Sequence, residues 1–176
     1  MRKNLTKQKI QAGQTVYGAF VNMYCPPIVE MFGLIGFDFV IIDAEHGPMG
    51  IENCENMVRA ADTVNIPPIT RIAVNTQQNI LRYLDIGAAG VQMPMINSKA
   101  DAEAVVQAVK YPPEGKRGLA GVRAADYGLT GSLADYVKKA NRETLVVVHV
   151  ETIEATKNLK ETLTVPGIDV VFIGPT

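Results

Sequence analysis

The chain has 176 residues, 47% of them hydrophobic, and a formal net charge of −1, so we expect one domain (residues 1–176) with a substantial core and no nucleic-acid or anionic-membrane partner. No apolar run reaches the roughly 18 residues of a membrane span, and the polar start MRKNLTKQKIQAGQ lacks the apolar centre of a signal peptide. The two cysteines, Cys25 and Cys54, form no disulfide pattern and predict free thiols in a reducing compartment, so we expect a cytoplasmic protein.

Six short apolar runs rich in Val, Ile and Phe predict strands that are covered on both faces. In chain order they are residues 15–21, 37–43, 67–70, 90–94, 144–151 and 169–174. Amphipathic helical patterns lie between them, at residues 51–62, 76–88, 98–111 and 151–163. Ser98 is the expected N-cap of one of these helices and Gly87 the expected end of another. This alternation predicts βα units and a parallel sheet.

One connection interrupts the alternation. The segment YPPEGKRGLAGVRAADYGLTGS, residues 111–132, is rich in glycine and has little apolar periodicity. A connection of about 20 residues is long for a compact domain and is usually either functional or disordered.

Polar or loop-forming residues follow the predicted strands. In parallel βα folds, ligands bind at the carboxyl ends of the strands, so these residues are the candidates for a site. In chain order they are Asp43, Glu45 and His46, then Arg71, then Met93-Pro94-Met95, then His149 and Glu151, and finally Gly174-Pro175-Thr176.

Each candidate also has a structural interpretation. Asp43 and Glu45 could cap the following helix, and His46 could be a solvated loop residue. The arginine after the third strand could lie on the surface. Glu151 could be a first-turn acid favoured by the helix dipole, and His149 a hydrogen-bonded core residue. Their common location at strand ends is what favours a site.

The residue types indicate chemistry on a small acid. A strand-end glutamate is a hard oxygen ligand suited to Mg²⁺ or Mn²⁺, and an arginine can hold a carboxylate or stabilise an enolate oxygen. A histidine close to an acid can act as a base. The chain has no dinucleotide fingerprint, P-loop, nucleophile elbow or zinc-spaced cysteine pair, and no strand lysine stands out as a Schiff-base former.

Five segments in order carry a family resemblance: GFDFVIIDAEHGP, LDIGAAGVQMPMINS, YPPEGKRGLAG, VVHVETIEATKNL and GIDVVFIGPT. Together they resemble the HpcH/HpaI aldolases, metal-dependent 2-oxo acid aldolases that include 4-hydroxy-2-oxoheptanedioate and 2-dehydro-3-deoxyglucarate aldolases. The resemblance covers nearly the whole chain. It implies an α/β fold, a (β/α)₈ TIM barrel of the phosphoenolpyruvate/pyruvate type, truncated here after its sixth strand.

The resemblance also implies roles for the strand-end residues. His46 would be the base, acting through water, with Asp43 holding its imidazole. Arg71 would stabilise an enolate oxygen and bind the 2-oxo acid, and Glu151 would be a metal ligand. The segment Gly174, Pro175 and Thr176 would line the carboxylate pocket through backbone amides.

The implied partners are small molecules, a metal and other copies of the chain. The substrates would be pyruvate, or another 2-oxo acid, and an aldehyde, with Mg²⁺ or Mn²⁺ as the metal and Co²⁺ as a further candidate. The family assembles as homo-oligomers, usually hexamers. Arg117 and Arg123, in the long connection, would lie near the mouth of the site, where a role in aldehyde choice is a hypothesis.

Two departures from the family pattern stand out. The family usually has glutamine where this chain has His149, which could replace its hydrogen bond, add a ligand or give the site a pH dependence. His149 is also a candidate substrate-binding residue. The family also continues GP-x-D, where the aspartate is a second metal carboxylate, and the sequence stops at Thr176, one residue before that position. Barrels of this kind typically need about 250 residues, so we expect a fragment of a longer protein.

Three functions remain open on the sequence alone. The leading one is a class II aldolase that cleaves or forms a 4-hydroxy-2-oxo acid through a metal-stabilised enolate. The second is a related lyase or decarboxylase on the same scaffold. The third is a truncated, non-catalytic half-barrel that binds a partner.

Overall fold

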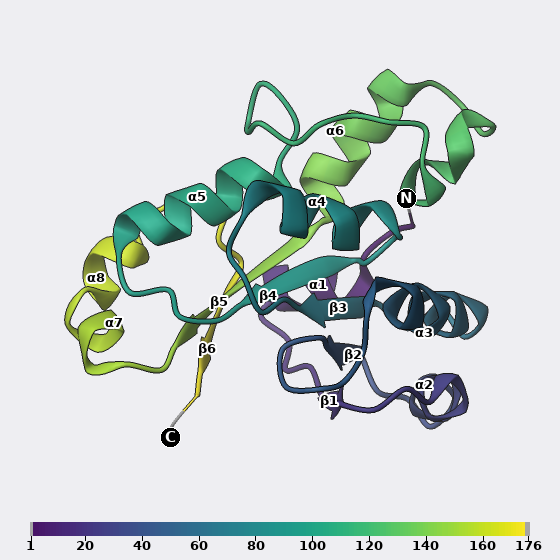
Figure 1. Ribbon diagram of the computed structural model, residues 1–176, viewed down its shortest axis with the longest axis horizontal. Coiled ribbons are helices and arrows are strands. Elements are labelled where there is room, and N and C mark those ends of the chain that lie inside the picture. The colour runs from purple at the N-terminus through teal and green to yellow at the C-terminus, as the bar shows by residue number, and fades with distance from the viewer. Residues whose placement is uncertain (1, 175–176) are drawn as a thin grey trace.

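The computed structural model describes residues 2–174 and forms a curled sheet with helices around its outer face (Figure 1). Six strands lie in consecutive order and every neighbouring pair is parallel, which is the arrangement of a βα barrel and confirms the predicted fold class. The strands are β1 (Gly18–Val21), β2 (Phe39–Asp43), β3 (Pro68–Arg71), β4 (Gly90–Met93), β5 (Leu145–Val150) and β6 (Val170–Ile173).

Helices connect the strands and cover the sheet (Figure 1). They are α1 (Leu5–Gln11), α2 (Pro26–Leu34), α3 (Ile51–Thr63), α4 (Gln77–Asp85), α5 (Lys99–Val109), α6 (Leu133–Glu143), α7 (Ile153–Lys157) and α8 (Leu159–Thr162). The expected caps are present, since Ser98 and Asp101 form a reciprocal capping box at the start of α5. Gly87 follows α4 with a φ of 102°, a conformation that glycine adopts without strain. No helix within residues 2–174 is long and apolar enough to cross a membrane.

Three helices were not among the predicted ones. Helix α1 is short and polar, and its Lys7 is buried against Asp169 at 2.9 Å, a contact between chain segments that local periodicity does not reveal. Helix α2 begins with prolines, which suit the first turn of a helix. Helix α6 begins at an N-cap, Ser132, inside the segment predicted as a long loop. The pattern predicted at residues 151–163 is divided into α7 and α8.

The outer face of the sheet forms the larger core. Side chains that point outward from the strands, such as Ile42, Val91 and Val148, pack with apolar side chains of the helices, such as Met57 and Leu84. Burial of these side chains is the main force that holds helices and sheet together, at roughly 25 cal/mol per Å² of apolar surface.

The inward-facing positions change character along the strands. A smaller apolar cluster inside the curl contains Ile41, Ile69, Leu145 and Val147. Two residues further along β2, β3 and β5, the inward-facing residues are Asp43, Arg71 and His149, because side chains two residues apart share a face. The apolar layer therefore lies below a polar layer, and the polar layer lies at the carboxyl ends of the strands.

The first and last described strands approach each other inside the curl. The ring of Phe20, on β1, meets the ring of Phe172, on β6, edge to face with centroids 5.8 Å apart. The guanidinium of Arg71 lies 5.0 Å from the centroid of Phe20, and the imidazole of His149 stacks on Phe172 at 4.7 Å. The two aromatic rings therefore support the side chains of Arg71 and His149 in the polar layer.

Candidate active site

Asp43 and Arg71 form the centre of the candidate site. They are register partners at the ends of β2 and β3, and Arg71 donates from Nε to Asp43 Oδ1 at 2.8 Å and from Nη2 to Oδ2 at 2.5 Å. Asp43 is 2% exposed. Burial alone would raise the pKa of Asp43, but the hydrogen bonds from Arg71 and from two backbone amides outweigh it and lower this pKa. The hydrogen bond to Asp43 in turn raises the pKa of Arg71.

The same carboxylate shapes the loop after β2. Asp43 Oδ1 accepts from the backbone N–H groups of Glu45, at 3.1 Å, and His46, at 3.2 Å. This is a local side-chain turn of the kind that aspartate favours. The position of the arginine and the path of the loop are therefore set by one side chain.

Glu45, and not Asp43, lies beside the imidazole of His46. Its Oε2 is 3.6 Å from His46 Nε2 and 3.4 Å from Arg71 Nε. The expected contact between the Asp43 carboxylate and this imidazole is not seen among the described residues; Asp43 accepts instead from the backbone N–H of His46 and from Arg71. The side chain of His46 is 67% exposed, so it can meet a substrate from solvent.

A second series of hydrogen-bonded side chains links β4 to the end of β5. Gln92 Nε2 lies 2.5 Å from His149 Nε2, and His149 Nδ1 lies 3.1 Å from Glu151 Oε2. A carboxylate can only accept, so Nδ1 carries the proton toward Glu151, and in the neutral ring Nε2 accepts from the Gln92 amide. Glu151 also accepts from the backbone N–H of Met95 at 2.7 Å. Burial would raise the pKa of Glu151, but these two contacts lower it.

Gln92 is a member of the site that the sequence interpretation missed. It is fully buried, it is the register partner of Arg71, and its Oε1 has no hydrogen-bond partner within the described chain. The available signal was strand alternation, because a glutamine inside the apolar run GVQMP is unusual for a strand covered on both faces. His149 is 1% exposed and also contacts Glu151, so it is both a buried, hydrogen-bonded residue and a member of the candidate site.

The predicted carboxylate pocket is only partly described. Gly174 lies beside Glu151, since a Cβ added there would be 3.4 Å from Glu151 Oε2. Its backbone N–H donates to the carbonyl of Val150 at 3.2 Å, so this amide serves the sheet. Pro175 and Thr176 lie outside the described residues.

Glu151 is the candidate metal ligand among the described residues, which do not by themselves form a metal site. Across residues 2–174, no group of three or more His, Cys, Asp or Glu side chains is arranged to hold a metal ion. Glu151 fits as one hard oxygen ligand, because a carboxylate keeps further lone pairs after accepting two hydrogen bonds. The unpartnered Oε1 of Gln92 is a second oxygen in the same polar layer.

The expected place of Arg117 and Arg123 near the mouth is wrong. Arg123 donates to Asp62 in α3 and to the carbonyl of Ile86 after α4, and Arg117 pairs with Asp85 in α4. These helices return from the carboxyl ends of the strands, so their own carboxyl ends lie at the opposite edge of the sheet. The long connection therefore lies at the amino ends of the strands, away from Asp43.

The sheet and the site together define an α/β barrel of the enzyme type, with charged and partly buried side chains at the carboxyl ends of successive strands. The sequence profile of the HpcH/HpaI aldolase/citrate lyase family matches residues 16–176. The chain belongs to this family.

Relatives of known name support this assignment. The chain is 36% identical to a hydroxypyruvate/pyruvate aldolase of Sagittula stellata, over 98% of the chain and 68% of that protein. It is 34% identical to a 4-hydroxy-2-oxo-heptane-1,7-dioate aldolase of Escherichia coli, over 98% of the chain and 66% of that protein. The crystal structure of an HpcH/HpaI aldolase from Desulfitobacterium hafniense superimposes with a TM-score of 0.92 at 30% identity, over 98% of the chain and 66% of that structure. The chain thus spans about two thirds of the length of these relatives.

Proposed function

We propose that this chain carries the substrate-binding face of a class II aldolase. The enzyme would cleave a 4-hydroxy-2-oxo acid to pyruvate and an aldehyde, or form the acid from these two compounds. The observation that carries the proposal is Arg71, which Asp43 fixes at two points at the end of β3. A guanidinium has five N–H groups, so donors remain for the oxygens of a 2-oxo acid.

Cleavage needs one proton removed and one returned. A base takes the proton of the substrate hydroxyl, the bond to the carbon beside the oxo group breaks, and the aldehyde leaves. The electron pair of that bond forms the enolate of pyruvate, which takes a proton on carbon. Arg71 donates to the oxygen on which the enolate charge develops. His46 is the exposed base, and Glu45 at 3.6 Å orients its ring and stabilises the imidazolium that forms.

A divalent metal held in part through Glu151 would add positive charge near the same oxygen. The contacts of Glu151 to Met95 N–H and to His149 fix its carboxylate in the polar layer. His149, held from its other side by Gln92, is the positioning residue for this carboxylate. Mg²⁺ and Mn²⁺ suit an oxygen-rich ligand set.

Self-association is also part of the proposal. Met31, Leu34 and Ile35, on and just after α2, are 58%, 76% and 70% exposed, and a contact with another copy of the chain would cover them. The molar mass of the chain in solution, measured by light scattering on a size-exclusion column, tests this self-association.

The experiment that tests the proposed reaction is exchange of the pyruvate methyl protons for deuterium, followed by proton NMR. It requires enolate formation and no knowledge of the aldehyde. We expect the methyl signal to decay with Mg²⁺ and to persist after a chelator is added. A folded chain that gives no exchange with Mg²⁺ or Mn²⁺ contradicts the proposal and favours a non-catalytic barrel.

A further inference from the structure

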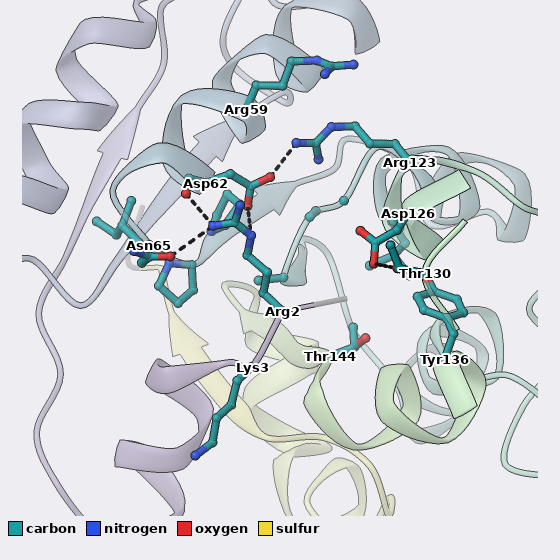
Figure 2. Close-up of a pocket in the computed structure, with 18 of the residues that line it drawn as sticks. Arg2, Lys3, Arg59, Asp62, Asn65, Arg123, Asp126, Thr130, Tyr136 and Thr144 are labelled. Carbon is teal, nitrogen blue, oxygen red and sulfur yellow. Dashed lines mark hydrogen bonds and ion pairs between the residues drawn. The ribbon is translucent and has the colours of Figure 1, made fainter. Parts of the chain in front are cut away.

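A cavity of about 990 Å³ lies between the N-terminal segment, α3 and the long connection (Figure 2). Its walls include Pro68, the first residue of β3, and Ala89 and Thr144, which directly precede β4 and β5. It therefore opens at the amino ends of these strands. Its volume falls in the upper part of the range of small-molecule sites, about 300–1,000 Å³.

The charged side chains of this cavity are mainly basic. They are Arg2, Lys3, Arg59, Arg117 and Arg123, against the acids Asp62 and Asp126. Arg2 and Arg123 reach Asp62 from two sides, with Arg2 Nε 3.3 Å from Oδ1 and Arg123 Nη2 2.5 Å from Oδ2 (Figure 2). One carboxylate thus faces two guanidinium groups, which leaves an excess of positive charge between the N-terminal segment and the long connection.

Arg117 adds positive charge to the wall of the same cavity. The residue is 3% exposed, its Nη2 donates to Asp85 at 2.7 Å, and its guanidinium lies 4.6 Å from the centroid of Tyr111. Its Nε has no hydrogen-bond partner within residues 2–174, but it is buried in the wall. Arg117 therefore adds to the electrostatic attraction for an anion and is not a donor that a ligand reaches directly.

The remaining walls are largely apolar. Ile66, Pro67, Pro68, Leu84 and Ala88 are among the residues that line the cavity. Asp126 also lines it and accepts from Thr130 at 2.7 Å, and its negative charge disfavours an anionic group beside it (Figure 2). A ligand that complements these walls has its anionic group among the arginines and an apolar body against the prolines.

We propose that this cavity is a second binding site, separate from the candidate active site, that takes a small organic carboxylate with an apolar body. The carboxylate would bind between Arg2 and Arg123, and the apolar body would pack on Pro67, Pro68 and Leu84. The inference depends only on the groups that line the cavity and holds whether or not the proposed aldolase reaction is correct.

The test is a titration of the full chain with benzoate, followed by amide chemical shifts in two-dimensional NMR. We expect saturable binding, with the largest shifts at Gly87, Ala88 and Ala89, and no binding of the uncharged analogue benzamide. Arg2→Gln should raise the Kd about threefold or more. The matched control is Arg82→Gln, an exposed arginine of α4 outside the cavity, which should leave the Kd unchanged.

A second variant removes more of the accessible positive charge. Arg2→Gln combined with Lys3→Gln should abolish saturable binding while circular dichroism stays that of the folded chain. No saturation up to about 10 mM benzoate overturns the proposal. Chemical-shift changes confined to the residues around Arg71 also overturn the proposal, as does an equal effect of Arg2→Gln and Arg82→Gln on the Kd for benzoate.

Discussion

Asp43 and Arg71 face each other from neighbouring strands as a two-point ion pair, with side chains only 3% and 14% exposed. The pair lies where the inward-facing residues change from apolar to polar. Breaking a buried pair leaves a charge without compensation, which costs more than the pair contributes when intact.

The first prediction concerns this pair and stability. Arg71→Met should lower the free energy of unfolding by about 3–5 kcal/mol, because it leaves the Asp43 carboxylate buried and unpaired. The double variant Asp43→Asn/Arg71→Met should recover part of this loss. Urea unfolding measures both. Arg59→Met, which breaks an exposed pair with Glu55 at 2.5 Å, is the control and should cost below about 1 kcal/mol. Equal costs for the two arginines would contradict the coupling.

The second prediction concerns catalysis. Arg71→Lys keeps the positive charge but cannot hold Asp43 and a 2-oxo acid at the same time with fixed geometry. We expect the rate of pyruvate proton exchange to fall about 100-fold. Arg59→Lys should exchange at the parent rate. A normal rate in folded Arg71→Lys would remove the arginine from the proposed mechanism.

The third prediction concerns the metal. Glu151→Gln removes the charge of the one strand-end carboxylate that the described residues offer as a ligand, so the Kd for Mn²⁺ should rise about tenfold or more. Isothermal titration calorimetry gives this constant directly. Glu154→Gln, three residues along and exposed, is the matched control. Unchanged Mn²⁺ affinity in Glu151→Gln would exclude this glutamate from the metal site.

Much of the fold, and part of the site, could be predicted from the sequence. The strands are apolar runs of the right length, and parallel order follows from the helical patterns between them. The grouping of Asp43, Glu45, Arg71 and Glu151 at one edge follows from strand direction. The partner of each carboxylate could not be predicted, because it depends on the geometry of side chains from different strands. Asp43 holds Arg71 with both oxygens, and Glu45 lies between Arg71 and His46.

The errors have physical causes too. The family resemblance placed Arg123 near the mouth, yet it anchors the long connection to Asp62 and Ile86 at the amino ends of the strands. The order of elements already indicates this edge, because the connection follows helix α5 and precedes strand β5. Gln92 was missed because its partner, His149, lies 57 residues away on the next strand.

The fourth prediction concerns the two thiols. Both cysteines are free within the described chain, as expected, but Cys54 is fully buried and Cys25 is partly exposed. Burial raises the pKa of Cys54 to about 11, so little thiolate forms at pH 8. Ellman's reagent should therefore react quickly with one thiol per native chain and with two after unfolding. Cys25→Ser should remove the fast reaction; a fast reaction that persists in this variant would contradict the assignment.

The fifth prediction concerns stability at high pH. Burial, with a smaller effect of Lys7, lowers the pKa of Lys110 from 10.5 to about 8, although its ammonium group donates to the carbonyl of Asn141. The pKa of Lys110 is lower in the folded chain than in the unfolded chain, so the folded chain loses this proton at a lower pH. Deprotonation removes the free-energy cost of the buried charge. The resulting stability is therefore complete above pH 10.5 and is lost as the pH falls through 8.

Compared with Lys110→Met, the parent chain should gain up to about 3 kcal/mol of unfolding free energy between pH 8 and 10.5. Urea unfolding at several pH values measures the difference. Lys160→Met, at an exposed position of α8, should show no such trend. A parent-to-variant difference that does not change with pH would contradict the shifted pKa.

Inside the curl, an apolar inward-facing position on a strand is followed, two residues later, by a polar inward-facing position. Ile41 and Ile69 belong to the apolar cluster that holds the sheet together, while Asp43 and Arg71, two residues further on, form part of the candidate site. Selection for a new substrate can therefore act on one ring of positions while selection for folding acts on the ring below it. In such a protein, variants that change what is bound need not be the variants that lower expression, and a mutational scan should separate the two sets along each strand.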